Sequence, residues 1–217
     1  MARLDTKLIL TQRDYLILNE VGRWKYLLAR QIKELMAFPS QSACDHRIAK
    51  LCKNGFLKGE HILVGIRSLY FLGSKARRIS TIKYYSYRVK LDEMSHDIAV
   101  VDTVIWFMKT KNLSLDDIRS EKELHSKEGF TGIGGRTHKP DFIFKKGRKT
   151  YCVEVELTPK SKARFENNIR DNFTTYDGQY WVVPKRERKV RAMLEEMKKP
   201  DTELIDLEVI HEGTFKK

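Results

Sequence analysis

Two short runs rich in apolar and β-branched residues lie in the second half of the chain, and they predict a β-hairpin. The runs cover residues 140–144 and 151–157, and a basic Lys-Gly-Arg-Lys turn separates them. Side chains of a strand point alternately to opposite faces, so Glu154 and Glu156 share one face while the valines between them share the other. The pattern predicts a sheet with one apolar face and one acidic face.

The acidic face of this hairpin predicts a site for a cation. Two carboxylates side by side repel each other, and a half-buried strand does not normally hold them without a partner. Asp141 opens the neighbouring strand and brings a third carboxylate close to Glu154 and Glu156. Three acidic groups that converge at one sheet edge suit a hard divalent cation such as Mg²⁺ or Mn²⁺. The alternative is a hairpin whose exposed face is acidic and binds no metal.

The same residues resemble a known nuclease pattern. A Pro-Asp pair at Asp141, then Glu154-x-Glu156 and Lys160, is similar to the PD-(D/E)xK nuclease superfamily. The resemblance implies that Asp141 and Glu154 hold the metal ion. The superfamily usually has a water-activating lysine two residues after the first acidic residue of the second strand, where this chain has Glu156. Some restriction enzymes of the superfamily have Glu there, and others supply the lysine from the following helix, where Lys160 or Lys162 would serve.

The distribution of charge predicts two domains with different partners. The chain of 217 residues carries a formal net charge of +13. Residues 1–90 hold 18 Lys and Arg against 6 Asp and Glu, whereas residues 91–217 hold 24 against 23. Such asymmetry is typical of a polyanion-binding module joined to a nearly neutral domain. A solvated basic surface is the alternative, but the lopsided charge favours nucleic acid as the partner.

The first 90 residues predict a helix-turn-helix followed by a hairpin. Thr11 is a suitable N-cap for a first helix, a second helix is expected at about 28–36, and a third from about 41 to 54. Strands at 56–58 and 67–72 then form a wing. The stretch that ends the third helix and enters the first wing strand is similar to winged-helix transcription regulators. A short fourth helix is expected at 74–78, and an aromatic, basic run at 84–88 reads as a link between domains.

The resemblance to winged-helix regulators implies that the third helix enters the major groove of double-stranded DNA. Gln pairs bidentately with adenine and Ser bonds several base edges, whereas Lys and Arg hold phosphates. The expected base-reading residues are Gln41, Ser42, Asp45 and His46, and the expected phosphate-binding residues are Arg47, Lys50, Lys53 and Arg67. For the lysines, the alternative is a solvated helix face.

Residues 91–217 predict a mixed sheet with helices on its faces, so the chain as a whole is expected to be α/β (α+β). Around the acidic hairpin, the sequence predicts a helix at 94–111, a strand at 115–125, a flexible Gly-rich loop at 129–135, a helix at 160–176, a strand at 180–184, a helix at 189–198 and a strand at 203–210. In the helix at 160–176, the residues expected to face inward are Phe165, Ile169 and Phe173. This order agrees with a PD-(D/E)xK-like core.

Cysteine spacing and hydropathy exclude some classes of protein. The three cysteines, Cys44, Cys52 and Cys152, form no CxxC pair, which excludes a zinc site of that type and a disulfide framework. Reduced thiols are expected, as in a cytoplasmic protein. No apolar run approaches the length of a membrane span.

Taken together, the two parts resemble the replication-relaxation family, which includes plasmid mobilisation accessory proteins of the MobC type. The features that carry the resemblance are the winged helix, His96 near the start of a long amphipathic helix, His138 before Asp141, and Glu154-x-Glu156. The resemblance implies a DNA-binding accessory factor that assists a relaxase and represses transcription, with the nuclease-like domain as a scaffold. A homodimer is expected if the DNA site is an inverted repeat. The alternative is a Mg²⁺-dependent endonuclease targeted by its winged helix.

Overall fold

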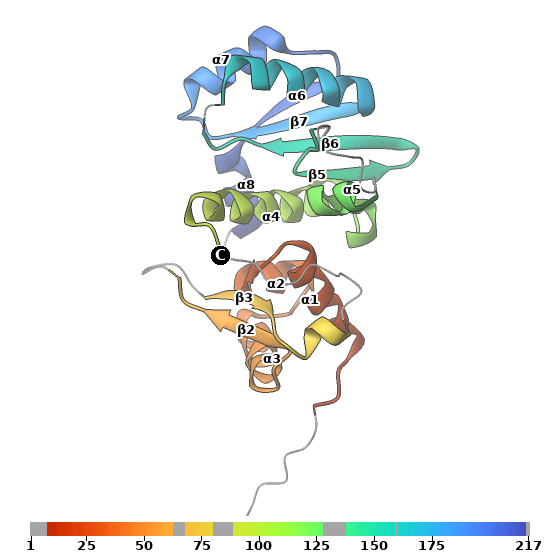
Figure 1. Ribbon diagram of the computed structural model, residues 1–217, viewed down its shortest axis with the longest axis vertical. Helices are drawn as coiled ribbons and strands as arrows, with labels where there is room; N and C mark the ends of the chain where they lie inside the picture. Colours follow the sequence, from red (N-terminus) through yellow and green to blue (C-terminus); the bar gives the residue numbers. More distant parts are fainter. Residues whose placement is uncertain (1–7, 63–67, 80–88, 128–137, 159, 216–217) are drawn as a thin grey trace, which may run out of the picture. The chain divides into compact units, whose positions relative to one another are not determined.

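The structure is a computed structural model that describes residues 8–62, 68–79, 89–127, 138–158 and 160–215 (Figure 1). The chain divides into two compact units, Met1–Val89 and Lys90–Lys217, a boundary within one residue of the predicted one. The described residues form several helices and two β-sheets, which confirms the predicted mixed α and β class. Three predicted features lie outside the described residues: Arg67, the link at 84–88 and the loop at 129–135.

The first unit begins with three helices at the predicted places: α1 (Gln12–Arg23), α2 (Ala29–Leu35) and α3 (Gln41–Lys53). Thr11 caps α1 as expected, because its hydroxyl accepts a bond from the backbone N–H of Asp14 at 3.3 Å. The Asp14 carboxylate in turn accepts the backbone N–H of Thr11 at 2.6 Å, which completes a capping box. The chemistry of the first turn therefore fixes where α1 begins.

A small antiparallel sheet completes the first unit. The chain leaves α3 at Gly55, whose φ of +76° lies in the left-handed region that favours glycine, and turns into β2 (Leu57–Glu60). β2 pairs with β3 (Leu69–Leu72), which also pairs with the short β1 (Leu27–Leu28), so the strand order is β1-β3-β2. The helix predicted at 74–78 is only a 3-10 turn, η1 (Ala76–Arg78).

The second unit is built on a five-stranded mixed sheet, as predicted. Its strands, in spatial order, are β4 (Ile118–Ser120), β5 (Phe142–Lys146), β6 (Lys149–Val155), β7 (Gly178–Val183) and β8 (Thr202–Asp206). β4, β5 and β6 are antiparallel neighbours, whereas β6, β7 and β8 run parallel. The predicted acidic hairpin is therefore the centre of the sheet, where its antiparallel part joins its parallel part.

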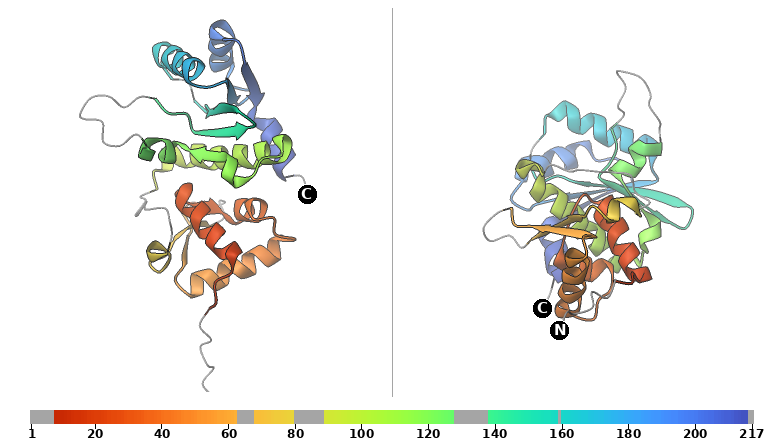
Figure 2. Two further views of the ribbon diagram at one scale, coloured as in Figure 1. Left: turned by 90° about the vertical axis from the view of Figure 1, so that its right-hand side faces the viewer. Right: turned by 60° about the horizontal axis from the view of Figure 1, so that its bottom comes forward.

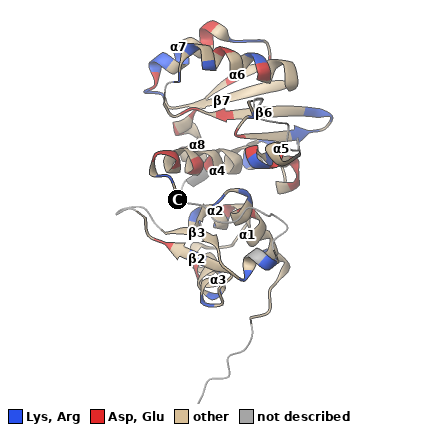
Figure 3. Cartoon of the chain, viewed as in Figure 1, with Lys and Arg blue, Asp and Glu red and all other residues tan. Residues whose placement is uncertain are grey.

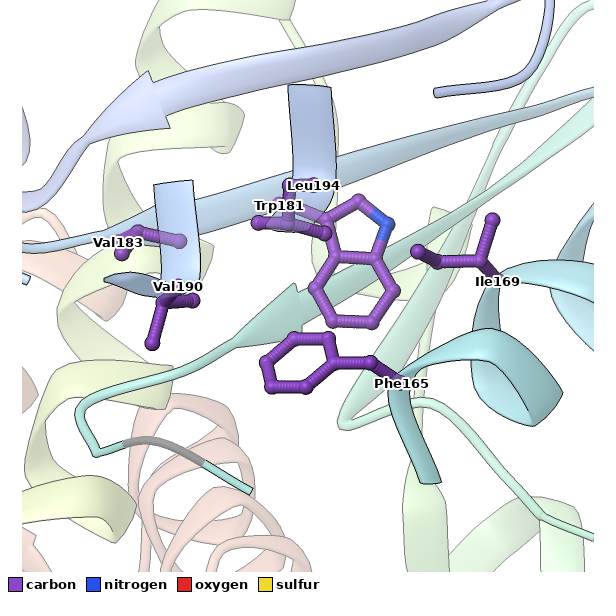
Figure 4. Packing of buried hydrophobic residues seen from close by; sticks show 6 residues of the cluster. All are labelled: Phe165, Ile169, Trp181, Val183, Val190 and Leu194. Atoms are coloured by element: carbon purple, nitrogen blue, oxygen red, sulfur yellow. The ribbon is translucent and has the colours of Figure 1, made fainter. Parts of the chain in front are cut away.

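Helices cover both faces of this sheet (Figure 2). On one face lie α6 (Lys162–Thr175) and α7 (Arg188–Met197). On the other lie α4 (Leu91–Lys111) and α8 (Leu207–Phe215). The core under α6 and α7 is a cluster of aromatic and aliphatic side chains (Figure 4), namely Phe165, Ile169, Trp181, Val183, Val190 and Leu194. Burial of these side chains out of water holds the two helices on the sheet.

Aromatic rings fill the core on the α4 face. Phe107 of α4 is completely buried, and its ring lies 5.0 Å from that of Tyr180, 5.2 Å from that of Phe144 and 6.0 Å from that of Phe142. Centroid separations of this size are favourable for aromatic pairs. The rings anchor α4 across β5 and β7, and this fixes the position of the start of α4 relative to the end of β6.

The prediction of one strand across residues 115–125 is wrong. Only Ile118–Ser120 is a strand, and it lies between a 3-10 turn, η2 (Leu115–Asp117), and a helix, α5 (Glu121–Lys127). The backbone N–H of Ser120 donates to the carboxylate of Glu123 at 2.8 Å, which is half of a capping box. The alternation of apolar and polar residues predicts a strand here, but this local bond stabilises the start of a helix instead.

Two further expectations need correction. The strand predicted at 203–210 ends at Asp206, and residues from Leu207 onward form α8, in which Ile210 is completely buried. In α6, Phe165 and Ile169 face the core as predicted, but Phe173 does not, because it is 44% exposed. The inward position of that turn belongs to Asn172, seven residues after Phe165, as a helical period of 3.6 residues requires.

Candidate functional site

The exposed face of α3 carries most of the residues predicted to contact DNA. Ser42, His46, Lys50 and Lys53 are all exposed, and their spacing of four, four and three residues places them on one side of the helix. The opposite side, including the buried Ile48, packs into the core. Two hydrogen-bonding side chains therefore lie near the start of α3, and two ammonium groups lie near its end.

Gln41 and Asp45 contact each other. The amide of Gln41 donates to the carboxylate of Asp45 at 2.8 Å, one turn along the exposed side of α3. An exposed bond of this kind contributes only about 1 kcal/mol. A base edge can therefore displace it, but the bond holds the two side chains in one orientation until that happens.

Arg47 has a different environment from its predicted phosphate-binding neighbours. Its guanidinium Nε donates to Asp14 of α1 at 2.7 Å, and a second nitrogen bonds the other carboxylate oxygen and the carbonyl of Ile9. Asp14 is completely buried. Burial acts to raise the pKa of Asp14, but the bonds from Arg47 and Thr11 outweigh it and hold that pKa below its usual range. Arg47 therefore fastens α3 to the start of α1.

A shallow hollow of about 490 Å³ lies between the start of α1 and α3. The side chains of Arg13, His46 and Lys50 are among those that line it. The Arg13 guanidinium is held 4.8 Å from the centre of the Phe38 ring, which is a cation–π distance. The hollow is thus electropositive and continuous with the exposed face of α3.

In the second unit, the three predicted carboxylates gather at one end of the sheet. Asp141 directly precedes β5, Glu154 is the second-to-last residue of β6, and Glu156 follows that strand. Because Phe142 pairs with Val153, the same register places Asp141 opposite Glu154. The two glutamates are each only 3% exposed. Burial raises the pKa of both, and the charge of Asp141 adds to the effect.

Asp141 is paired with His96, which projects from α4. The His96 Nε2 atom lies 3.4 Å from the Asp141 carboxylate and donates to the carbonyl oxygen of Val155 at 2.9 Å. Asp141 itself accepts the backbone N–H of Val155 at 2.7 Å. Burial acts to lower the pKa of His96, but the charge and hydrogen bond of Asp141, together with the charge of Asp97, outweigh burial and raise that pKa to about 9. The imidazolium and the carboxylate together hold the last residue of β6.

Glu154 has two partners of its own. His138 Nε2 lies 2.5 Å from one Glu154 carboxylate oxygen, and the side-chain amide of Asn172 donates to the same oxygen at 2.9 Å. Burial acts to lower the pKa of His138, but the hydrogen bond to Glu154 and the charges of Glu154 and Asp141 together outweigh burial and leave the pKa above its ordinary value. The pKa of Glu154 is also raised, mainly because the carboxyl group is buried, so His138 and Glu154 titrate as one interacting pair.

Glu156 is paired with Lys160. The ammonium nitrogen lies 2.5 Å from the carboxylate of Glu156, and this contact acts to lower a pKa that burial raises. Lys162, the other lysine considered from the sequence, instead bonds Glu196 of α7 at 3.0 Å. Of these two lysines, Lys160 is the one that reaches the carboxylates.

The carboxylates do not converge on a common point where an ion would sit. Asp141, Glu154 and Glu156 each have a cationic side chain of the chain itself as partner. Across the residues that the structure describes, no group of three or more His, Cys, Asp or Glu side chains is arranged to hold a metal ion. A divalent cation bound to Asp141 and Glu154 would have to displace the two histidine contacts first.

Three residues of this cluster had no role assigned from the sequence. His96 and His138 had served only as marks of a resemblance, and Asn172 had not been considered. A polar residue at an inward helix position is a usable signal for Asn172, because a buried amide needs a partner. His96 reaches Val155 across 59 residues of sequence, so no local pattern identifies that contact.

Comparisons of the chain with models of protein families, with curated proteins and with solved structures found no match. None of the helices in the described part of the chain combines the length and apolar character needed to cross a membrane. Proposals about function therefore rest on the residues and geometry given above.

Proposed function

We propose that this protein binds double-stranded DNA through its first unit, a winged-helix domain in which α3 is the recognition helix. The observation that carries the proposal is the exposed face of α3, where Ser42, His46, Lys50 and Lys53 are aligned. Residues 1–90 add a net charge of +12, which attracts the phosphate backbone. The resulting function is that of a plasmid mobilisation or replication-relaxation accessory factor that also represses transcription and works beside a relaxase.

The residues of α3 take separate parts in this function. Ser42 and His46 read base edges, together with Gln41 and Asp45 once their mutual bond opens. Lys50 and Lys53 hold phosphates. Arg47 acts indirectly, since its bonds to Asp14 fix the orientation of α3.

The second unit serves this function as a PD-(D/E)xK-like scaffold. A mixed sheet between helices, with Asp141 opposite Glu154 at one end, supports the assignment to that fold. The ion pairs made by His96, His138 and Lys160 offset the carboxylate charge from within the chain. Carboxylates neutralised in this way stabilise the sheet end without a metal, which favours a scaffold over an enzyme.

A Mg²⁺-dependent endonuclease is the second candidate, and one observation favours it. The amine of Lys160 is held beside Glu156, in the place from which a lysine of the following helix would orient a water molecule. In that function Asp141 and Glu154 hold Mg²⁺ or Mn²⁺, which supplies the activated water when bound. His96 and His138 then have to release their carboxylates.

Supercoiled plasmid incubated with Mn²⁺ separates the two candidates. The scaffold predicts that the plasmid stays supercoiled and that Mn²⁺ leaves the melting temperature of the protein unchanged. The endonuclease predicts nicked or linear plasmid with the wild type and none with Glu154→Ala, and a melting temperature that rises with Mn²⁺ by mass action. Nicking that persists in Glu154→Ala would point to a contaminating nuclease.

Selection from a library of random duplexes tests the DNA-binding function itself. The wild type is expected to enrich one sequence motif, and an enriched inverted repeat would indicate a homodimer. Ser42→Ala should relax the motif at one position, by about 1–3 kcal/mol for a good base contact. Lys53→Ala should weaken binding to all sequences and leave the motif unchanged. A wild type that enriches no motif would contradict the repressor and accessory role.

A further inference from the structure

The outer end of the β5–β6 hairpin is a second basic surface, in the unit whose total charge is nearly zero. Figure 3 shows this end of the hairpin in the colour of Lys and Arg. Four of its five consecutive residues are cationic and exposed, namely Lys145, Lys146, Arg148 and Lys149. We call these four residues the hairpin tip. They lie at the opposite end of β5 and β6 from Asp141 and Glu154, so they are separate from the carboxylate cluster.

The geometry of the hairpin tip is that of a tight, open turn. Lys146 pairs with Lys149 across a two-residue loop of Gly147 and Arg148. Gly147 has a φ of +63°, as the first position of a type II′ turn requires, and nothing lies within 4 Å of where its Cβ would be. Among the described residues, therefore, none packs against this side of Gly147, and the turn is open.

The charges of the hairpin tip have no ionic partner in the described part of the chain, and they repel one another. Lys146 and Lys149 are directly opposite on adjacent strands, an arrangement that destabilises a sheet. None of the ion pairs formed among the described residues involves Lys145, Lys146, Arg148 or Lys149. A bound polyanion would offset the repulsion among these four cations, and it would therefore stabilise the folded protein.

Another basic run in the same unit gives a useful contrast. Residues 185–189 also hold four cations in five residues, at the start of α7. There, however, Lys185 lies 3.6 Å from Asp206, and Arg186 lies 3.6 Å from Glu187. Carboxylates of the chain thus partly neutralise that run, whereas the hairpin tip has no such neighbours among the described residues.

We propose that the hairpin tip is a second DNA-binding surface, which contacts the phosphate backbone of duplex DNA independently of α3. A two-stranded β-ribbon fits the major groove, which is about 12 Å wide. The four charges extend over about 10 Å of strand, close to the axial rise of about three base pairs. This inference rests on the proposed DNA-binding function and extends it to the second unit.

The chemistry of the hairpin tip favours duplex DNA over other polyanions. Single-strand binding surfaces stack bases on aromatic rings, and the tip exposes none, because nearby Tyr151 stacks on Phe144 at 5.1 Å. Membrane-surface segments add apolar side chains to their basic ones, and residues 145–149 contain no apolar side chain. Contact with backbone phosphates needs only the cations that are present.

The test measures binding of the full-length protein to a labelled random-sequence duplex over a range of salt concentrations. The tip variant carries Lys145→Ala, Lys146→Ala, Arg148→Ala and Lys149→Ala. The control variant removes the same charge through Lys185→Ala, Arg186→Ala, Arg188→Ala and Lys189→Ala. Each phosphate contact contributes about 0.9 to the slope of log affinity against log salt, so a tip variant that loses four contacts should lose about 3 to 4 from that slope. The control variant should lose less than half as much from the slope. It should melt near the wild-type temperature, whereas the tip variant should melt at or slightly above that temperature, because the repulsion between Lys146 and Lys149 is removed.

The outcomes separate this inference from the function on which it rests. Equal losses in the tip and control variants would show that only net charge matters, which overturns the inference. An unchanged slope in the tip variant, with weakened binding by Lys50→Ala/Lys53→Ala, would overturn the inference and leave the proposed function intact. A wild type that binds no duplex contradicts both. A tip variant that keeps duplex binding but loses binding to phosphatidylserine vesicles would assign the hairpin tip to a membrane surface instead.

Discussion

Arg47 and Lys50 stand one turn apart on α3, yet their surroundings give them different roles. Arg47 bonds a fully buried carboxylate, whereas Lys50 is exposed. Arg47→Ala leaves Asp14 buried without its cation, which should destabilise the protein by about 2–4 kcal/mol. Lys50→Ala should change the free energy of unfolding by less than about 0.5 kcal/mol. Urea denaturation of the two variants checks this, and equal stability of both would refute the structural role of Arg47.

The raised pKa of His96 predicts that the protein loses stability at alkaline pH. Its neighbours Asp141 and Asp97 raise its pKa to about 9 against the opposing effects of burial and Lys160. A histidine whose folded pKa is raised contributes fully below its unfolded pKa of about 6.5 and loses that contribution as the pH passes through about 9. The difference in melting temperature between wild type and His96→Gln should therefore shrink as the pH rises through this window. A difference that stays constant up to pH values above that range would count against the His96–Asp141 pair.

At the scale of single elements, α5 depends on the bond between Ser120 and Glu123. Glu123→Ala removes the acceptor of the Ser120 backbone N–H and should destabilise the protein by about 1 kcal/mol. Ser126→Ala is the matched control, because Ser126 is an exposed residue of the same helix and should have little effect. Helical circular dichroism with chemical denaturation measures both. If the two variants are equally stable, the capping bond does not define the start of α5.

Elements whose ends are fixed by local chemistry could be predicted from the sequence. Thr11 and Asp14 define the start of α1, and Gly55 defines the end of α3. The turn at Gly147 places the hairpin and its carboxylates. By contrast, residues 115–125 contain both an apolar alternation and the Ser120–Glu123 cap, and the cap decides the structure of their second half. When two local patterns predict different structures, the packing of the surrounding residues decides between them, and the sequence alone does not show that packing.

The partners of the carboxylates could not be predicted in the same way. The sequence places Asp141 and Glu154 opposite each other in the hairpin, but His96 reaches Asp141 only because aromatic packing holds α4 across the sheet. Asn172 reaches Glu154 because α6 packs on the other face. Contacts of this kind depend on how whole helices pack on the sheet, and the sequence near the carboxylates does not predict them.

At the scale of the whole molecule, net charge describes each unit incompletely. Residues 1–90 carry a net charge of +12, and this favours DNA binding. The second unit is nearly neutral in total, yet its sheet carries an acidic cluster paired with His and Lys at one end and the unpaired hairpin tip at the other. A net charge near zero thus combines a buried cluster of paired carboxylates with an exposed basic surface, and only the exposed basic surface is proposed to bind DNA.

The central claim is that duplex DNA binds through α3, and a salt titration of Lys50→Ala/Lys53→Ala tests it most directly. Fluorescence anisotropy with a labelled duplex gives affinity against salt concentration for this variant, the wild type and Lys198→Ala/Lys199→Ala as a control of equal charge. The wild type should bind with a steep salt dependence, and the α3 variant should lose affinity and about 2 from the log–log slope. The control should match the wild type closely. Equal affinity and slope in the wild type and the α3 variant would contradict the claim.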